Sequence, residues 1–149
     1  VIAVAACAPE EVSRYGVIAG DRVGSLEGFE NAADDEPGAV WRIGGLVEKP
    51  APEAAPSNLY IVGRYLLSPL VMDLLADQQA GKGGEIQLTD AMAEYARSYG
   101  GMTAVEFTGK HYDMGNKLKV AEAQVELALQ HPEIGEAFRA YLKEFCKTL

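Results

Sequence analysis

The sequence predicts an α/β fold with a mostly parallel or mixed sheet and a C-terminal helical tail. Five short apolar runs with strand-like composition alternate with segments of helical period, which is the pattern of an α/β protein. The chain has 149 residues, the length of one ordinary domain, and 48% of them are hydrophobic, which is enough for a core. No internal repeat or low-complexity tract in the sequence indicates another architecture.

Three strands are predicted in the first third of the chain. The runs Val1–Ala5 and Tyr15–Ile18 flank a polar turn at Pro9–Ser13, and Val40–Val47 is the third run. Residues 28–38 are rich in acidic side chains and have no hydrophobic period, so we interpret them as a surface loop and not as a metal site. Because the first strand is already under way at residue 1, we expect the natural reading frame to begin well upstream.

The middle of the chain alternates strand and helix. Leu59–Leu67 is a β-rich run, after which Ser68 and Pro69 provide an N-cap and a first-turn proline for a helix. Thr89 is expected to cap a second helix, which Gly100 ends. Four residues of this second helix share one face: Met92, Tyr95, Ala96 and Tyr99.

The last part of the chain is predicted to be a strand, a loop and two helices. Met102–Phe107 is the fifth strand, Thr108–Lys117 is the loop, and Pro132 separates the helices. An apolar stripe marks the second of these helices: Ile134, Phe138, Tyr141, Leu142 and Phe145. We therefore divide the chain into an α/β part, residues 1–117, and a helical tail, residues 118–149, that packs on it or on a neighbouring subunit.

Charge and cysteine content restrict the classes of partner. With 22 acidic and 13 basic side chains the formal charge is -9, which repels nucleic acid and anionic membrane surfaces. Cys7 and Cys146 form no CxxC pair and no cluster with zinc-ligand spacing, so we expect reduced thiols. No apolar run approaches the roughly 18 residues of a membrane span, and we expect a cytoplasmic protein.

Glu48 and Lys49 are the first candidate for a functional pair. They lie at the end of a predicted strand, where α/β sheets bind ligands, and adjacent residues on a strand point to opposite faces. Taken alone, an acid and a base before a proline are more typical of an exposed loop.

Two further segments combine polar side chains with flexible backbone. The loop Gly109–Lys117 contains His111, Asp113 and Asn116 and suits a metal-bound phosphate, although helix capping and a surface histidine explain it equally well. Gly83–Asp90 has glycines and polar groups around a helix start, which a simple helix beginning mostly explains. A strand start similarly explains Tyr15 and Gly16, and none of these features is decisive alone.

In order along the chain, these segments resemble the bacterial UTP:glucose-1-phosphate uridylyltransferases. The resemblance runs from about Val1 to about Leu142, with spacing preserved outside residues 24–40. Related thymidylyltransferases share Tyr-Gly, Glu-Lys-Pro and a late Asp-x-Gly, but the string at residues 84–90 resembles the uridylyl branch more closely. The matching segments are Ser13-Arg14-Tyr15-Gly16-Val17, Gly45-Leu46-Val47-Glu48-Lys49-Pro50, Ala55-Pro56-Ser57-Asn58, Ile61-Val62-Gly63-Arg64-Tyr65, Gly84-Glu85-Ile86-Gln87-Leu88-Thr89-Asp90 and the loop Gly109-Lys110 to Asp113 with Gly115-Asn116-Lys117.

The resemblance implies the C-terminal part of a nucleotide-diphospho-sugar transferase, a Rossmann-like fold. The reaction would form UDP-glucose and pyrophosphate from UTP and glucose 1-phosphate, and family members are commonly homo-oligomers. The family's glycine-rich phosphate loop and first magnesium-binding Asp lie upstream of this sequence, so the chain alone is expected to be inactive without the N-terminal half. Central strands also come largely from that half, which predicts an uncovered apolar sheet edge here.

The resemblance also assigns site residues. Lys49 would hold the sugar phosphate, Glu48 would accept hydrogen bonds from glucose hydroxyls, and Gly16 would give close backbone contact to the sugar. Asn58 would line the same pocket, and Asp113 would be a catalytic carboxylate ligand for Mg²⁺. Two alternatives stay open: a non-catalytic sugar-phosphate-binding or oligomerisation module, and a related nucleotidyltransferase such as a thymidylyltransferase.

Overall fold

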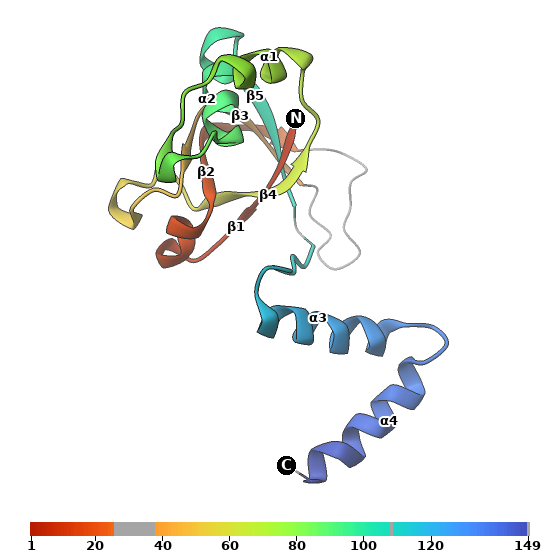
Figure 1. Cartoon of the computed structure of the whole chain (residues 1–149). Helices are drawn as coiled ribbons and strands as arrows, with labels where there is room; N and C mark the ends of the chain where they lie inside the picture. The colour runs from red at the N-terminus through yellow and green to blue at the C-terminus, as the bar shows by residue number, and fades with distance from the viewer. Residues whose placement is uncertain (26–37, 108, 149) are drawn as a thin grey trace. The chain divides into compact units, whose positions relative to one another are not determined.

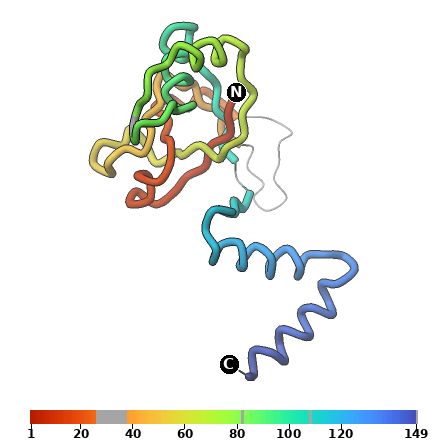
Figure 2. Tube along the Cα trace, in the orientation of Figure 1, coloured from red at the N-terminus to blue at the C-terminus, as the bar shows by residue number. Residues whose placement is uncertain are grey.

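The computed structural model describes residues 1–25, 38–107 and 109–148, which form two compact units. The first unit is Val1–Gly109 and the second is Lys110–Leu149. Figure 2 traces the chain from the N-terminus in the first unit to the C-terminus in the second. Most of the predicted acidic loop, residues 28–38, lies outside the described residues, as do Glu30, Asp34, Asp35 and Glu36 within it. The division between an α/β part and a tail after Lys117 stays a prediction.

A closed, mixed sheet forms the centre of the first unit (Figure 1). The strand order is β1-β4-β2-β3-β5, and β5 pairs back with β1. Within the described residues the β1–β5 pairing is parallel and the other pairings are antiparallel. The sheet is therefore mixed, which is one of the two possibilities that the sequence predicted. The strands are β1 (Ile2–Ala6), β2 (Gly16–Ser25), β3 (Ala39–Glu48), β4 (Leu59–Tyr65) and β5 (Met102–Glu106).

Closure of the sheet overturns the expectation of an uncovered sheet edge. β1 has β4 on one side and β5 on the other, so the backbone groups of both its edges are engaged. Its apolar side chains, Ile2 and Val4, are fully buried. The other strands likewise have a neighbour on each side within the described part of the chain. The sheet thus closes by backbone pairing, with β2 and β4 joined at one residue pair, Val17 and Tyr60.

Two helices close the core of the first unit. α1 (Pro69–Asp77) and α2 (Leu88–Ser98) lie beside the sheet in Figure 1. Val71 of α1 and Met92 of α2 are fully buried and belong to the same apolar cluster as Ile18 of β2. Ala96 belongs to this cluster too and Tyr95 packs against it, so the predicted apolar face is confirmed for Met92, Tyr95 and Ala96; it is wrong for Tyr99, which is 51% exposed at the C-cap of α2.

The N-cap predicted from the sequence is correct for α1 and wrong for α2. Ser68 caps α1 as predicted: the Leu70 N–H donates to its Oγ at 3.3 Å, and Pro69 occupies the first helical turn. The prediction that Thr89 caps α2 is wrong. Gln87 takes the N-cap position, so Thr89 lies inside the first turn of α2, and its hydroxyl donates a hydrogen bond to Glu48.

The second unit consists of a loop and a helical pair. α3 (Lys117–Gln130) and α4 (Gly135–Phe145) are separated near Pro132, as predicted. Asn116 caps α3, since its Oδ1 accepts the backbone N–H groups of Leu118 and Lys119. Short 3₁₀ turns complete the described structure: Pro9–Arg14, Pro52–Ala54, Lys82–Gly84 and Cys146–Thr148.

Candidate functional site

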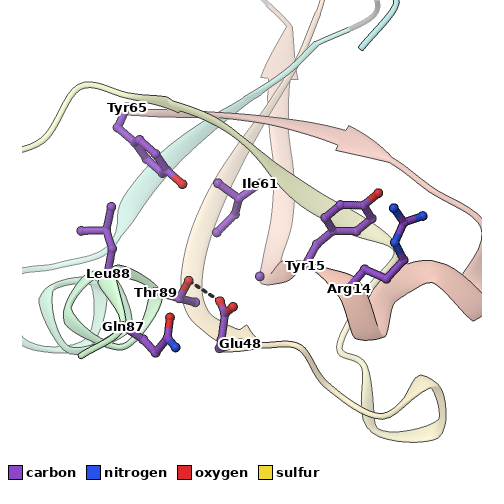
Figure 3. A pocket seen from close by; sticks show the side chains of 9 residues that line it. Arg14, Tyr15, Glu48, Ile61, Tyr65, Gln87, Leu88 and Thr89 are labelled. Carbon is purple, nitrogen blue, oxygen red and sulfur yellow. Dashed lines mark hydrogen bonds between the residues drawn. The ribbon is translucent and has the colours of Figure 1, made fainter. Parts of the chain in front are cut away.

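A polar pocket of about 290 Å³ lies where β2 begins, β3 ends and α2 begins. Figure 3 shows Glu48 between the α2 side of the pocket, with Thr89, and the side that carries Tyr15. The pocket belongs wholly to the first unit. Its lining residues are Arg14, Tyr15, Gly16, Glu48, Ile61, Tyr65, Gln87, Leu88 and Thr89.

Glu48 is the central acceptor of this pocket. It is the last residue of β3, and its side chain is only 12% exposed. Thr89 Oγ1 donates to Glu48 Oε2 at 2.6 Å, and Lys49 Nζ lies 3.7 Å from Glu48 Oε1. One carboxylate oxygen thus accepts a hydrogen bond, and the other lies near a cation at more than hydrogen-bond distance.

Lys49 turns toward Glu48 because it has left the strand. Its φ of 46° is in the left-handed region, which costs a non-glycine residue about 1–2 kcal/mol. The Lys49 N–H still donates to the Tyr15 carbonyl at 2.9 Å, which holds this conformation beside β2. The expectation that Glu48 and Lys49 point to opposite faces is therefore wrong, since strand alternation does not extend to Lys49. Its side chain is about half exposed, and it reaches the Glu48 carboxylate without being part of the pocket lining.

Gly16 makes the close approach of the pocket's polar groups possible. It faces Glu48 across the β2–β3 pairing. A Cβ at this position would lie 2.9 Å from Thr89 Oγ1, 3.0 Å from Glu48 Oε2 and 3.1 Å from Ile61 Cδ1. Such contacts are shorter than van der Waals packing allows, so a side chain at residue 16 would displace the Glu48–Thr89 pair.

Two tyrosines give the pocket aromatic surface. Tyr15 packs on Tyr60 with ring centroids 4.5 Å apart, and the Arg14 guanidinium lies 5.2 Å from the Tyr15 ring centroid. Tyr65 borders the pocket near Glu48. Burial, and then the negative charge of Glu48, raise the pKa of Tyr65, so its hydroxyl stays a hydrogen-bond donor at neutral pH.

Asn58 lies apart from the lining of this pocket. Its amide Nδ2 donates to the Cys7 carbonyl at 3.2 Å, and the Cys7 N–H donates to the Asn58 carbonyl at 3.0 Å. These bonds tie the start of β4 to the end of β1. A direct role for Asn58 in binding stays a prediction, and its observed contacts are structural.

Asp113 belongs to the second unit, in the loop before α3. Its Oδ1 accepts the Gly115 N–H at 3.0 Å. The same loop is tied to α3, since Tyr112 donates to Glu126 at 2.8 Å and Lys110 is bonded to the same carboxylate. Among residues 1–25, 38–107 and 109–148, no three His, Cys, Asp or Glu side chains gather as a metal site. Asp113 therefore fits one ligand position for Mg²⁺ and not a complete set.

The structure brings together residues that the sequence did not assign. Gly16 and Glu48 line the pocket and Lys49 lies beside Glu48, while their roles in binding stay predictions; Thr89, Tyr65 and Arg14 line the pocket too. Thr89 carried a detectable signal, because it lies in the glycine-rich segment 83–90 beside a helix start. For Tyr65 and Arg14, the sequence contained no signal of a place in the site except that both lie in the motif segments.

The chain belongs to the nucleotidyl transferase family, as residues 1–144 match the family model described as "Nucleotidyl transferase". Among curated relatives, it is similar to the UTP–glucose-1-phosphate uridylyltransferase of Pseudomonas aeruginosa, with 42% identity over 126 residues, 85% of this chain and 39% of that protein. The enzyme of the same name from Streptococcus pneumoniae is 38% identical over 148 residues, 99% of this chain and 45% of that protein.

Solved structures of the same kind of enzyme resemble this one. The UTP-bound UGPase from Acinetobacter baumannii has a TM-score of 0.73 at 33% identity, over 96% of this chain and 44% of that one. A UDP-glucose pyrophosphorylase complexed with UDP-glucose has a TM-score of 0.66 at 36% identity, over 96% and 44%. The chain thus spans less than half the length of these relatives. No helix in the described part of the chain is long and apolar enough to cross a bilayer.

Proposed function

We propose that this chain supplies the sugar-phosphate side of a uridylyltransferase that forms UDP-glucose and pyrophosphate from UTP and glucose 1-phosphate. The observation that carries the proposal is the Glu48 carboxylate in the lining of the pocket, with the Lys49 ammonium 3.7 Å from its Oε1. The names of the relatives, uridylyltransferases and UDP-glucose pyrophosphorylases, support the substrates. A phosphorylated sugar requires both kinds of group, because its hydroxyls donate and its phosphate is anionic.

The chemistry asks for positioning more than for activation. A phosphate oxygen of glucose 1-phosphate attacks the α-phosphorus of UTP, the bond from that phosphorus to the bridging oxygen breaks, and pyrophosphate leaves with the electron pair. The attacking phosphate oxygen is already an anion and needs no activation. The rate acceleration therefore comes from aligning the two substrates and from compensating their negative charges. Lys49 holds the sugar phosphate, Glu48 accepts from sugar hydroxyls, and Gly16 leaves room for the sugar beside the backbone.

Asp113 is the residue of this chain that we propose as a Mg²⁺ ligand. Mg²⁺ usually takes one or two carboxylates together with substrate phosphates and water, so a single carboxylate from this chain suits it. The ion would supply charge compensation at the phosphates. Asp113 contributes a hard oxygen ligand, held by the bond from the Gly115 N–H and by the loop's attachment to α3.

The partners follow from the portion of the relatives that this chain matches. UTP and an N-terminal nucleotide-binding half would complete the active enzyme, and a homo-oligomer is the proposed assembly. The exposed residues of α4, among them Tyr141 and Phe145, suit such an assembly. We propose a cytoplasmic location, with neither nucleic acid nor membrane as a partner, on the basis of the acidic charge.

Pyrophosphate release tests the proposed reaction. The assay contains Mg²⁺, glucose 1-phosphate and either UTP or dTTP, with this chain alone or joined to the portion of the Pseudomonas aeruginosa relative that it does not match. We expect turnover in the joined protein only, with a preference for UTP. A preference for dTTP would identify a thymidylyltransferase, and no turnover in either form would contradict the catalytic proposal.

The second candidate is a sugar-phosphate-binding module without catalysis. The observation in its favour is that the whole pocket, with Glu48 and Lys49, lies within Val1–Gly109. Calorimetric titration of the chain with glucose 1-phosphate distinguishes the two when it is combined with the pyrophosphate assay. Binding without turnover in every form would support the module.

A further inference from the structure

Thr89 makes the most directional contact with the central carboxylate of the pocket. Its Oγ1–Glu48 Oε2 distance of 2.6 Å is that of a strong, charge-assisted hydrogen bond. Lys49 Nζ, at 3.7 Å from the other oxygen, lies beyond hydrogen-bond distance and is about half exposed. An exposed ion pair of this length attracts the carboxylate without fixing its rotation. The hydroxyl of Thr89 therefore sets the direction in which Glu48 points.

Burial and packing make this contact durable. Thr89 is 8% exposed and projects from the first turn of α2, which is anchored in the core by Met92. Gly16 closes the arrangement from β2, since a Cβ there would meet both Thr89 and Glu48. Three separate elements, β2, β3 and α2, thus hold one carboxylate, and the side chain cannot rotate without disturbing one of them.

The direction of the Thr89–Glu48 hydrogen bond determines which polar groups these two residues present to a ligand in the pocket. A threonine hydroxyl has one proton and two lone pairs, and the proton is donated to Glu48. Toward the pocket, Thr89 then offers only lone pairs, and the Glu48 carboxylate is also an acceptor. A wall of acceptors favours a ligand that presents hydroxyl donors, such as a sugar, over one that presents carbonyls or acids.

We propose that Thr89 is a positioning residue that fixes the Glu48 carboxylate as an acceptor for ligand hydroxyls. The fixing of Glu48 is a property of this chain by itself, whereas the identity of the ligand rests on the function proposed above. Thr89→Val removes the hydroxyl and keeps the shape, and Thr89→Ser keeps the hydroxyl and is the matched control. Two measurements on the 149-residue chain separate the two parts of the proposal.

The first measurement is a double-mutant cycle in urea unfolding with Thr89→Val, Glu48→Ala and the double variant. A hydrogen bond to a charged group is expected to give an interaction term equivalent to about a tenfold change in the unfolding constant. In the cycle of Thr89→Ser with Glu48→Ala, the interaction term should be much smaller, since serine retains the bond. Additive effects of Thr89→Val and Glu48→Ala would overturn the proposal, whatever the ligand is.

The second measurement is glucose 1-phosphate binding by titration calorimetry. We expect Thr89→Val to raise the Kd about tenfold and Thr89→Ser to leave it within about twofold of the wild-type value. Equal losses in both variants, or none in Thr89→Val, would overturn the positioning role. If the unaltered chain does not bind glucose 1-phosphate, the sugar-phosphate function fails, and the unfolding cycle alone decides whether Thr89 fixes Glu48.

Discussion

The two units hold their proposed functional carboxylates by different means. In the first unit, Glu48 is largely buried and is held by a buried threonine against a glycine. In the second unit, Asp113 lies in a loop that is tied to α3 by Lys110 and Glu126, whose side chains are 62% and 35% exposed. Salt screens buried contacts much less than it screens exposed ion pairs. This difference predicts that the proposed sugar-phosphate site around Glu48 is preorganised, whereas the conformation of the Asp113 loop changes with salt and pH.

Removal of the Lys49 cation should have the largest effect. Loss of one preorganised charge at a phosphate is expected to lower kcat of the joined protein by at least about 100-fold, with the fold unchanged by circular dichroism. Lys143→Ala, which removes an exposed lysine of α4, is the matched control and should keep full turnover. Unchanged turnover of Lys49→Ala would contradict the catalytic assignment.

Gly16→Ala tests the preorganised side of the comparison. The added methyl group meets Thr89, Glu48 and Ile61 at 2.9–3.1 Å, so we expect about 1–3 kcal/mol of destabilisation in urea unfolding and weaker glucose 1-phosphate binding. Gly44→Ala is the control, because nothing lies within 4 Å of a Cβ at that position of β3. Equal stability of the two variants would show that residue 16 tolerates a side chain.

Glu126→Gln tests the exposed side. Hydrogen bonds from Lys110 and then from Tyr112 lower the pKa of Glu126, so its contribution to stability is complete above the glutamate pKa of the unfolded chain. That contribution is lost as pH falls through the lower folded-state pKa. We expect a severalfold lower protection factor for amide exchange at Gly115 in the variant at neutral pH, and in the unaltered chain under acid conditions or high salt.

Glu136→Gln, on the exposed first turn of α4, is the control for Glu126→Gln. Exchange at Gly115 that is insensitive to Glu126→Gln would show that the loop is held by other contacts.

The smallest expected effect is on the ionisation of Tyr65. Burial is the first cause of its raised pKa and the Glu48 charge is the second, so Glu48→Gln should lower the Tyr65 pKa part of the way toward its ordinary value. Titration of the Tyr65 ring by NMR measures this change. Glu53→Gln, in an exposed turn, should leave the Tyr65 pKa unaltered, and a similar shift in both variants would mean that Glu48 does not act on Tyr65.

Local patterns predicted the elements of this protein well and their contacts less well. The five strands, the Ser68 cap and the division of the last helices at Pro132 were all readable, because strand composition, caps and proline act within a few residues. The role of Thr89 was not, since its hydroxyl donates to Glu48, which lies 41 positions away in the chain, beyond the reach of any local pattern. Tyr65 joined the site for the same reason.

The sequence by itself determined the α/β class, the order of the elements and the motifs that contain Gly16, Glu48 and Lys49, because periodicity and residue chemistry are local properties. Only the tertiary structure decided that β5 returns to pair with β1 and that Lys49 leaves its strand with a φ of 46°. It likewise decided that Thr89 donates to Glu48. Each of these depends on competition among distant partners for hydrogen bonds and burial, which is resolved only when the whole chain packs.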